Sequence, residues 1–285
     1  MNATPTLDTV HAVDGPWSLA TSRRFWEGFG PAALAAQNVE GGIRTVFLSD
    51  VDWQRVEASI TQEGEFARIT ASSVGDLEAA TAQVRRFMSI DIDGRAWPDV
   101  ATIDPVIAKA QRHLPGFRPC GFFSPYEAAA WAVLSQRVPM RQAAATKQRL
   151  TAEHGEAGAF PAPSVLLDLE LDLPGRKAEY LRAVAEAALD GVFSGERLRS
   201  LNSDEALRQV QQVTGLGPFA AELVVVRGAN FPDVLPVSEQ RLNAEIVEQY
   251  GTEKSVASIT EAWRPYRSWA SVHLRAMRAE RESQR

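Results

Sequence analysis

The feature that most constrains the fold of this chain is a change of sequence pattern near Asp104. From there to the C-terminus, apolar residues recur at helical spacing, and capping residues and glycines mark the helix ends. Ser124-Pro125-Tyr126-Glu127 is the clearest start, because Ser caps, Pro opens the helix and Glu follows at capping-box spacing. The pattern predicts helices over 124–136, 140–154, 177–190, 203–212 (with Ser203 as N-cap), 218–227, 238–250 and 265–279.

The first hundred residues mix strand and helix patterns. Strand patterns cover 43–48, 56–60 and 66–70, and helical patterns cover 19–28 and 77–88. The order is strand, helix, three strands, helix, which is typical of a small antiparallel sheet with helices packed on it. We therefore expect an α+β chain, with an α+β domain over 10–103 followed by an all-helical region over 104–285.

Composition excludes several classes of protein. The chain is 45% apolar and 23% charged, as in ordinary globular domains, and it has no long uncharged apolar run. The single cysteine, Cys120, excludes an internal disulfide and a four-cysteine metal centre, and the four histidines lack metal-ligand spacing. A net charge of −6 argues against non-specific coating of nucleic acid but leaves room for a local basic face. Without a secretory signal pattern or membrane span, we expect a cytoplasmic protein that does not bind membranes.

The most informative segment is Gly215-Leu216-Gly217-Pro218, between two expected helices. Two glycines permit positive φ and the close approach of another backbone. The N–H groups in the first turn of the helix that Pro218 opens are placed to bind a phosphate. Two other interpretations stay open, a plain helix–helix turn and a dinucleotide-binding Gly-x-Gly-x-x-Ala fingerprint. The fingerprint requires a preceding strand, whereas here a helix precedes it.

The segment 213–221 resembles the helix-hairpin-helix of base-excision DNA glycosylases. The loop Gly228…Pro232…Pro236 resembles the one that leads to the catalytic aspartate of that superfamily. The α+β N-terminal part is similar to the AlkA-like (3-methyladenine type II) branch, and further motif-like segments lie at 124–138, 173–181 and 263–269. The resemblance covers most of residues 10–280. It implies two helical subdomains around a cleft, double-stranded DNA with a damaged base as partner, and a monomer.

The resemblance also implies where DNA is held. Arg137 takes the position of the side chain that wedges into the duplex, with Gln136 beside it, although Arg137 could instead be an ordinary surface arginine at a helix end. N–H groups around Gly215 and Gly217 would contact phosphate, which positions the duplex without reading sequence. The side chains of Arg176 and Lys177 would add positive charge near the DNA. A sodium or potassium ion, the one cofactor implied, would bind the backbone carbonyls of Gln211, Val213 and Leu216 and bridge to the DNA.

Glu239 takes the position of the catalytic aspartate, whereas Asp233 matches a non-catalytic position of the family. In the family the carboxylate stabilises the oxocarbenium-like state in which the base leaves. The extra methylene of Glu moves the carboxylate by about 1.5 Å, and a displacement of that size can lower a rate on the order of 100-fold. A helix N-terminus near Glu239 would keep the carboxylate ionised. The alternative is that Glu239 is an ordinary first-turn acid.

The expected base pocket departs from the family in two places. Phe219 and Phe25 take positions of aromatic side chains that hold cationic bases, although Phe219 could also be core packing. Leu223 replaces an expected aromatic residue, and Arg275 replaces a tryptophan of the last helix. An arginine there would repel a cationic base or pair with Glu239.

The sequence thus predicts a DNA glycosylase that excises an alkylated or deaminated purine with water as the nucleophile. We expect it to be monofunctional, because no lysine lies before the Pro-rich loop, where bifunctional lyases of the superfamily carry one. The alternative is a glycosylase-fold protein that binds damaged DNA with weak or no catalysis. A tight ion pair between Glu239 and Arg275 that filled the pocket would favour this alternative.

Overall fold

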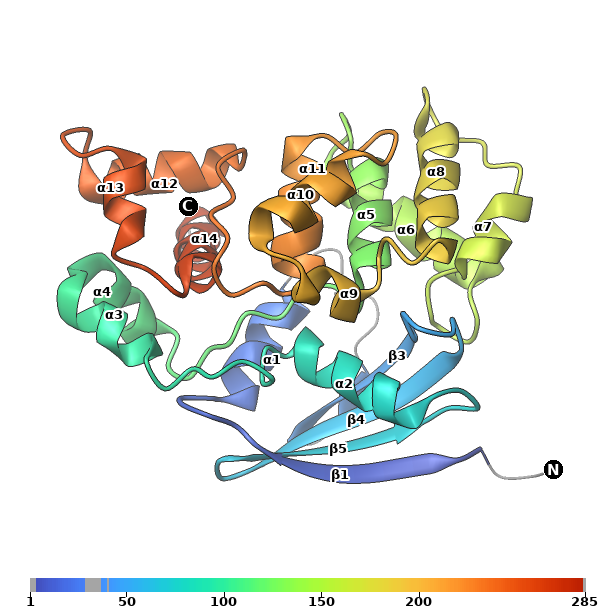
Figure 1. The fold of residues 1–285 in the computed structure, drawn as a ribbon, viewed down its shortest axis with the longest axis horizontal. Coiled ribbons are helices and arrows are strands. Elements are labelled where there is room, and N and C mark those ends of the chain that lie inside the picture. The colour runs from blue at the N-terminus through green and yellow to red at the C-terminus, as the bar shows by residue number, and fades with distance from the viewer. Residues whose placement is uncertain (1–3, 29–36, 40, 284–285) are drawn as a thin grey trace.

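Figure 1 shows an antiparallel sheet along one side of the molecule and two groups of helices on the other. The computed structural model describes residues 4–28, 37–39 and 41–283. The sheet is five-stranded with the order β1-β5-β4-β3-β2, and every neighbouring pair is antiparallel. Its strands are β1 (Thr6–Ala12), β2 (Gln37–Val39), β3 (Gly42–Leu48), β4 (Arg55–Glu63) and β5 (Phe66–Ser72). The predicted α+β class is therefore confirmed, and the structure adds β2 to the three strands expected between the first two helices.

Alternating burial explains how the sheet is covered. Every second residue of β5 is buried, as expected for a strand with one face on a core. The buried face packs on α1 (Leu19–Glu27) and α2 (Leu77–Phe87), with Trp26 and Phe87 almost fully buried. Asp76 begins α2 by accepting a hydrogen bond from the N–H of Ala79, so local capping chemistry agrees with the tertiary arrangement.

The expected helices over 104–285 are present with ends shifted by a few residues, and shorter helices occur between them. In chain order the helices after α2 are α3 (Trp97–Ile103), α4 (Pro105–His113), α5 (Pro125–Leu134), α6 (Met140–His154), α7 (Pro163–Asp168), α8 (Lys177–Leu189), α9 (Gly195–Ser200), α10 (Ser203–Gln211), α11 (Pro218–Leu223), the π-helical turn η1 (Val224–Gly228), α12 (Gln240–Tyr250), α13 (Val256–Glu261) and α14 (Arg267–Ser283).

Two predicted helix starts have different outcomes. Ser124 caps α5 as predicted, because its hydroxyl accepts a hydrogen bond from the N–H of Glu127. The prediction of Ser203 as a cap is wrong. Asn202 has the extended backbone of an N-cap and accepts from the N–H of Glu205, so the helix begins one residue earlier than the serine suggested.

The helices form two groups, each with its own core. One core lies among α5, α6, α8, α10, α11 and η1, and the other among α3, α4, α12, α13 and α14. Trp97 and Val100 of α3 belong to the second core, so the expected boundary between residues 103 and 104 separates elements that pack together. In Figure 1 the first group lies above the sheet, and the second lies beside the first at the left of the view.

Arg118 connects the N-terminal segment to the helical groups. Its guanidinium is fully buried and lies 5.3 Å from the ring centre of Trp269 on α14. It donates hydrogen bonds to the backbone carbonyls of Asp14, Pro16, Ser89 and Ile92. These acceptors compensate for the cost of removing the charge from water.

Candidate active site and nucleic-acid interface

A cavity of about 630 Å³ lies between the two helical groups. Its walls come from α11 and η1 on one side and from α14 on the other, and α1 and the start of α12 complete it. The cavity brings together the residues that the sequence assigned to catalysis and to the base pocket: Phe25, Phe219, Leu223, Glu239 and Arg275. Residues more than 200 positions apart in sequence therefore meet at one site.

Glu239 has two roles in this geometry. It is the N-cap of α12, and its carboxylate accepts hydrogen bonds from the N–H groups of Arg241 (3.0 Å) and Leu242 (3.1 Å). The same carboxylate pairs with Arg275 on α14, with 2.6 Å between Oε2 and Nε. Its side chain is 23% exposed and borders the cavity, so it is neither walled off nor in bulk solvent. The ion pair is tight, but it leaves the cavity open.

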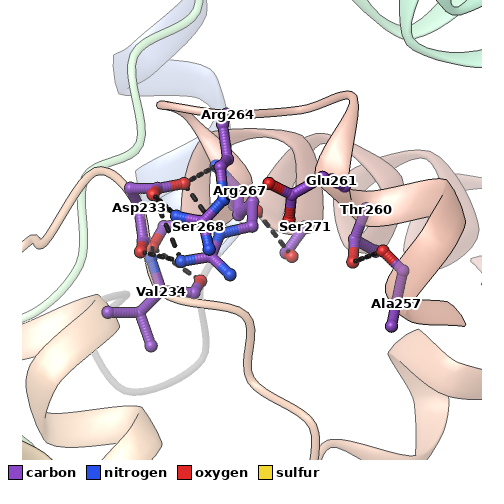
Figure 2. A network of polar contacts seen from close by, with 9 residues as sticks. All are labelled: Asp233, Val234, Ala257, Thr260, Glu261, Arg264, Arg267, Ser268 and Ser271. Carbon is purple, nitrogen blue, oxygen red and sulfur yellow. Dashed lines mark hydrogen bonds and ion pairs between the residues drawn. The ribbon is translucent and has the colours of Figure 1, made fainter. Parts of the chain in front are cut away.

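The loop before Glu239 is tied to the start of α14 by a polar network (Figure 2). The Asp233 carboxylate accepts from Arg267 Nε (2.8 Å) and Arg264 Nη1 (2.7 Å). The Ser268 hydroxyl accepts from the N–H of Val234 and donates to its carbonyl, both at 2.9 Å. Asp233 therefore positions the loop, and it is not among the residues that line the cavity.

A second carboxylate in the cavity, Glu222 on α11, was missed by the sequence analysis. It is 5% exposed and accepts hydrogen bonds from the N–H (2.9 Å) and hydroxyl (3.1 Å) of Ser238, the residue before Glu239. Burial raises the pKa of Glu222, and the nearby negative charge of Glu239 adds to the effect. Its spacing of three residues from Phe219 places both on one helix face, and this was the available signal.

The aromatic side chains of the cavity differ in their surroundings. Phe25 packs on the ring of Phe117 (4.6 Å between centres), and the Arg227 guanidinium lies 5.3 Å from the Phe25 ring centre. Burial lowers the pKa of Arg227 to about 10, so its guanidinium stays charged at neutral pH. Phe219 is 48% exposed, which is not the environment of a core residue. Trp131, by contrast, is buried in the core of the first helical group.

The predicted DNA-contacting turn follows α5. Arg137 is exposed and has a positive φ of 54°, an uncommon backbone conformation for a residue other than glycine. The Gln136 side chain points elsewhere, because its Nε2 donates to the carbonyl of Gly215 at 2.9 Å. Gln136 thus links the turn to the hairpin and leaves Arg137 as the projecting side chain.

The two hairpin glycines meet different requirements. Gly215 has φ +92°, and a Cβ there would lie 2.4 Å from Cγ of Tyr180. Gly217 has φ −85° and ψ −174°, is exposed, and has no atom within 4 Å of where a Cβ would lie. Gly215 is therefore required by the fold, whereas the space in front of Gly217 is open.

Lys177 does not contribute a surface charge, which corrects its predicted role. It is 8% exposed, and its ammonium donates at 2.7 Å to the carbonyl of Leu134, the last residue of α5. Burial also lowers the pKa of Lys177. Arg176 remains exposed, pairs with Glu179 at 2.5 Å, and lies 5.1 Å from the ring centre of Tyr180.

The expected cation position is on the hairpin backbone. The carbonyl of Val213 accepts from the N–H of Leu216 at 3.0 Å, and the ion on the carbonyls of Gln211, Val213 and Leu216 stays a prediction. Among the residues that the structure describes, no group of His, Cys, Asp and Glu side chains is arranged to hold a metal. Within the same residues, no helix is long and apolar enough to cross a membrane.

The sequence is similar to several curated DNA repair proteins. It is 23% identical over 218 residues to a DNA-3-methyladenine glycosylase of Bacillus subtilis, covering 69% of this chain and 71% of that protein. It is 24% identical over 261 residues to DNA-3-methyladenine glycosylase 2 of Escherichia coli, covering 85% and 89%. It is 28% identical over 238 residues to a probable bifunctional transcriptional activator/DNA repair enzyme AlkA of Mycobacterium tuberculosis, covering 78% of this chain and 48% of that protein. No protein-family model matches the chain.

Solved structures agree with the sequence relatives. A 3-methyladenine DNA-glycosylase from Archaeoglobus fulgidus superposes with a TM-score of 0.73 at 17% identity, covering 96% of this chain and 98% of the other. The 8-oxoguanine glycosylase/lyase of Clostridium acetobutylicum in complex with double-stranded DNA gives a TM-score of 0.67 at 15% identity, with the same coverage. The chain is therefore similar in sequence to AlkA-like DNA-3-methyladenine glycosylases, and it has the fold of helix-hairpin-helix DNA glycosylases.

Proposed function

We propose that this protein is a monofunctional DNA glycosylase that hydrolyses the N-glycosidic bond of a damaged purine. The observation that carries the proposal is the position of the Glu239 carboxylate, at the edge of a cavity between the hairpin helix α11 and α14. Enzymes that act on a base in duplex DNA must first move it out of the stack into such a pocket. The curated relatives, which are named DNA-3-methyladenine glycosylases, support this class of activity.

In this proposal each residue of the site acts at a different step of base release. Arg137 enters the duplex and fills the gap that the extruded base leaves. The N–H groups at Gly217 and at the start of α11 hold a phosphate, so the sugar faces the cavity. Glu239 stabilises positive charge at C1′ as the C1′–N bond breaks and its electron pair moves to the base. Water then bonds to C1′ and loses a proton.

The proposal includes that the enzyme hydrolyses the glycosidic bond without cleaving the DNA strand. A lyase step requires an amine that forms a covalent bond to C1′. No lysine is present among the described residues that line the cavity. Water is therefore the nucleophile that this set of side chains favours.

The test is single-turnover base release from duplex DNA that contains hypoxanthine or 7-methylguanine. We expect Glu239→Gln to lower the rate at least about 100-fold, while its side-chain oxygen can still accept a bond from the N-terminus of α12. Glu153→Gln, which changes a half-exposed acid on α6, is the matched control and should leave the rate unchanged. Equal rates for wild type and Glu239→Gln would remove Glu239 from the mechanism.

A second function is favoured by one observation, the 2.6 Å ion pair between Glu239 and Arg275. The pair neutralises the carboxylate on which the catalytic role depends. A protein in which the pair persists on DNA would bind damaged duplexes selectively, and with strong salt dependence, but would release no base. Measured turnover on any lesion would exclude this function.

A further inference from the structure

The charged groups that line the cavity are mostly cationic. Four arginines and three glutamates line it, namely Arg24, Arg227, Arg241 and Arg275 and Glu222, Glu239 and Glu280. Each carboxylate already has a partner in the protein. Glu239 pairs with Arg275, Glu222 accepts from Ser238, and Glu280 contacts His113. With four arginines against three glutamates, the lining carries an excess of positive charge, which disfavours a cationic base.

The aromatic wall does not compensate for this charge. An aromatic face attracts a cation through its quadrupole, and this is how a pocket can hold an alkylated purine. The Phe25 ring already has the Arg227 guanidinium 5.3 Å from its centre and packs against Phe117. Phe219 remains, but it is 48% exposed. The Arg227 guanidinium thus already lies against the aromatic ring, Phe25, on which a cationic base would be expected to stack.

Arg275 has unused hydrogen-bonding capacity. Its Nε is paired with Glu239, but its Nη1 is buried and has no acceptor among the described residues. A buried donor without an acceptor is costly, so a rotation that brings this group to an oxygen in the cavity is favourable. A carbonyl oxygen on the base would provide that acceptor without adding positive charge.

We propose that the cavity selects an uncharged base with a ring carbonyl oxygen, such as hypoxanthine, over cationic N-alkylated purines, and that Arg275 is the residue that determines this specificity. The inference rests on the proposed function and names the substrate class within it. The preferred substrate would then differ from 3-methyladenine, the base that appears in the names of the curated relatives.

The test compares three duplexes that differ at one base: hypoxanthine (uncharged, with a carbonyl), 7-methylguanine (cationic) and 1,N6-ethenoadenine (uncharged, without a carbonyl). Each single-turnover rate is divided by the spontaneous rate of base loss, because cationic bases leave more easily without an enzyme. We expect the rate enhancement of wild type to be at least tenfold greater for hypoxanthine than for either of the others. Arg275→Met should reduce the ratio of hypoxanthine to 7-methylguanine at least tenfold.

The ratio between substrates separates specificity from catalysis. Arg275→Met also frees Glu239, and the part of that change that is common to every base cancels in the ratio. Arg241→Gln is the matched control, since it removes a second guanidinium from the same cavity, and it should change the ratio much less. A wild-type preference for 7-methylguanine, an unchanged ratio in Arg275→Met, or an equal effect of Arg241→Gln would overturn the inference.

A failure of the proposed function gives a different result. If no variant releases any base, the glycosylase proposal is wrong, and the inference is judged by binding. The dissociation constants for the same three duplexes are then divided by that for undamaged DNA. Tightest binding of hypoxanthine, lost in Arg275→Met, would support the inference, and equal binding of all three would overturn it.

Discussion

Replacing each hairpin glycine by alanine should separate folding from DNA binding. In Gly215→Ala the new Cβ would lie 2.4 Å from Cγ of Tyr180, on a backbone with φ +92°. The left-handed conformation costs an L-residue about 1–2 kcal/mol, and overpacking of this kind costs about 1–3 kcal/mol. The free energy of unfolding should therefore fall by about 2–5 kcal/mol, a large part of the roughly 5–15 kcal/mol of an ordinary domain.

Gly217→Ala should have the opposite profile. The backbone there has φ −85°, which alanine adopts freely, and no atom lies within 4 Å of the new Cβ. Stability should stay constant or rise by up to about 1 kcal/mol, because alanine restricts the unfolded chain. DNA affinity should fall by roughly tenfold, or about 1.4 kcal/mol, because the methyl group occupies the space where a phosphate must approach.

Urea denaturation and fluorescence anisotropy with a labelled duplex measure the two effects. The denaturant slope should be equal in all three proteins, so that midpoints report stability directly. A Gly215→Ala protein within about 0.5 kcal/mol of wild type would refute the strain argument. Unchanged DNA affinity in Gly217→Ala would show that DNA does not approach the hairpin at this position.

Three further predictions concern the wedge, a buried arginine and a buried histidine. Arg137→Ala should slow base release far more than it weakens DNA binding, because an exposed wedge acts after docking. The fluorescence of 2-aminopurine placed beside the lesion should report less unstacking. Equal losses of rate and affinity would contradict the wedge role. Arg118→Met should lower the free energy of unfolding, measured in urea, by about 3 kcal/mol or more, because it leaves buried carbonyls without donors. The exposed control Arg95→Met should leave the free energy of unfolding nearly unchanged. A similarly small effect of both changes would refute the structural role of Arg118. Burial lowers the pKa of His273 to about 4, so only the unfolded chain takes up this proton as the pH falls from 6.5 to 4. The free energy of unfolding should therefore fall over that window by on the order of 3 kcal/mol. A His273→Gln protein with the same pH dependence would exclude His273 as the cause.

The sequence alone determined the features that depend on neighbours a few residues apart. Helix starts such as Ser124 and stops at glycine are set by local hydrogen-bonding and backbone freedom, so the helices were predicted within a few residues. The glycine pattern of the hairpin and the resemblance around it predicted the similarity to DNA glycosylases that the curated relatives show. They also indicated five of the residues that line the cavity, since motif positions carry their place in the fold: Phe25, Phe219, Leu223, Glu239 and Arg275.

Tertiary structure decided what depends on segments far apart in the chain. Lys177 and Glu222 look like surface residues in sequence, but each is buried because a partner, Leu134 or Ser238, lies where its polar group points. The pairing of Glu239 with Arg275 required α12 and α14 to meet, which no periodicity specifies. Burial, and with it charge and pKa, is a property of the packed molecule, because it depends on which distant atoms exclude water from a group.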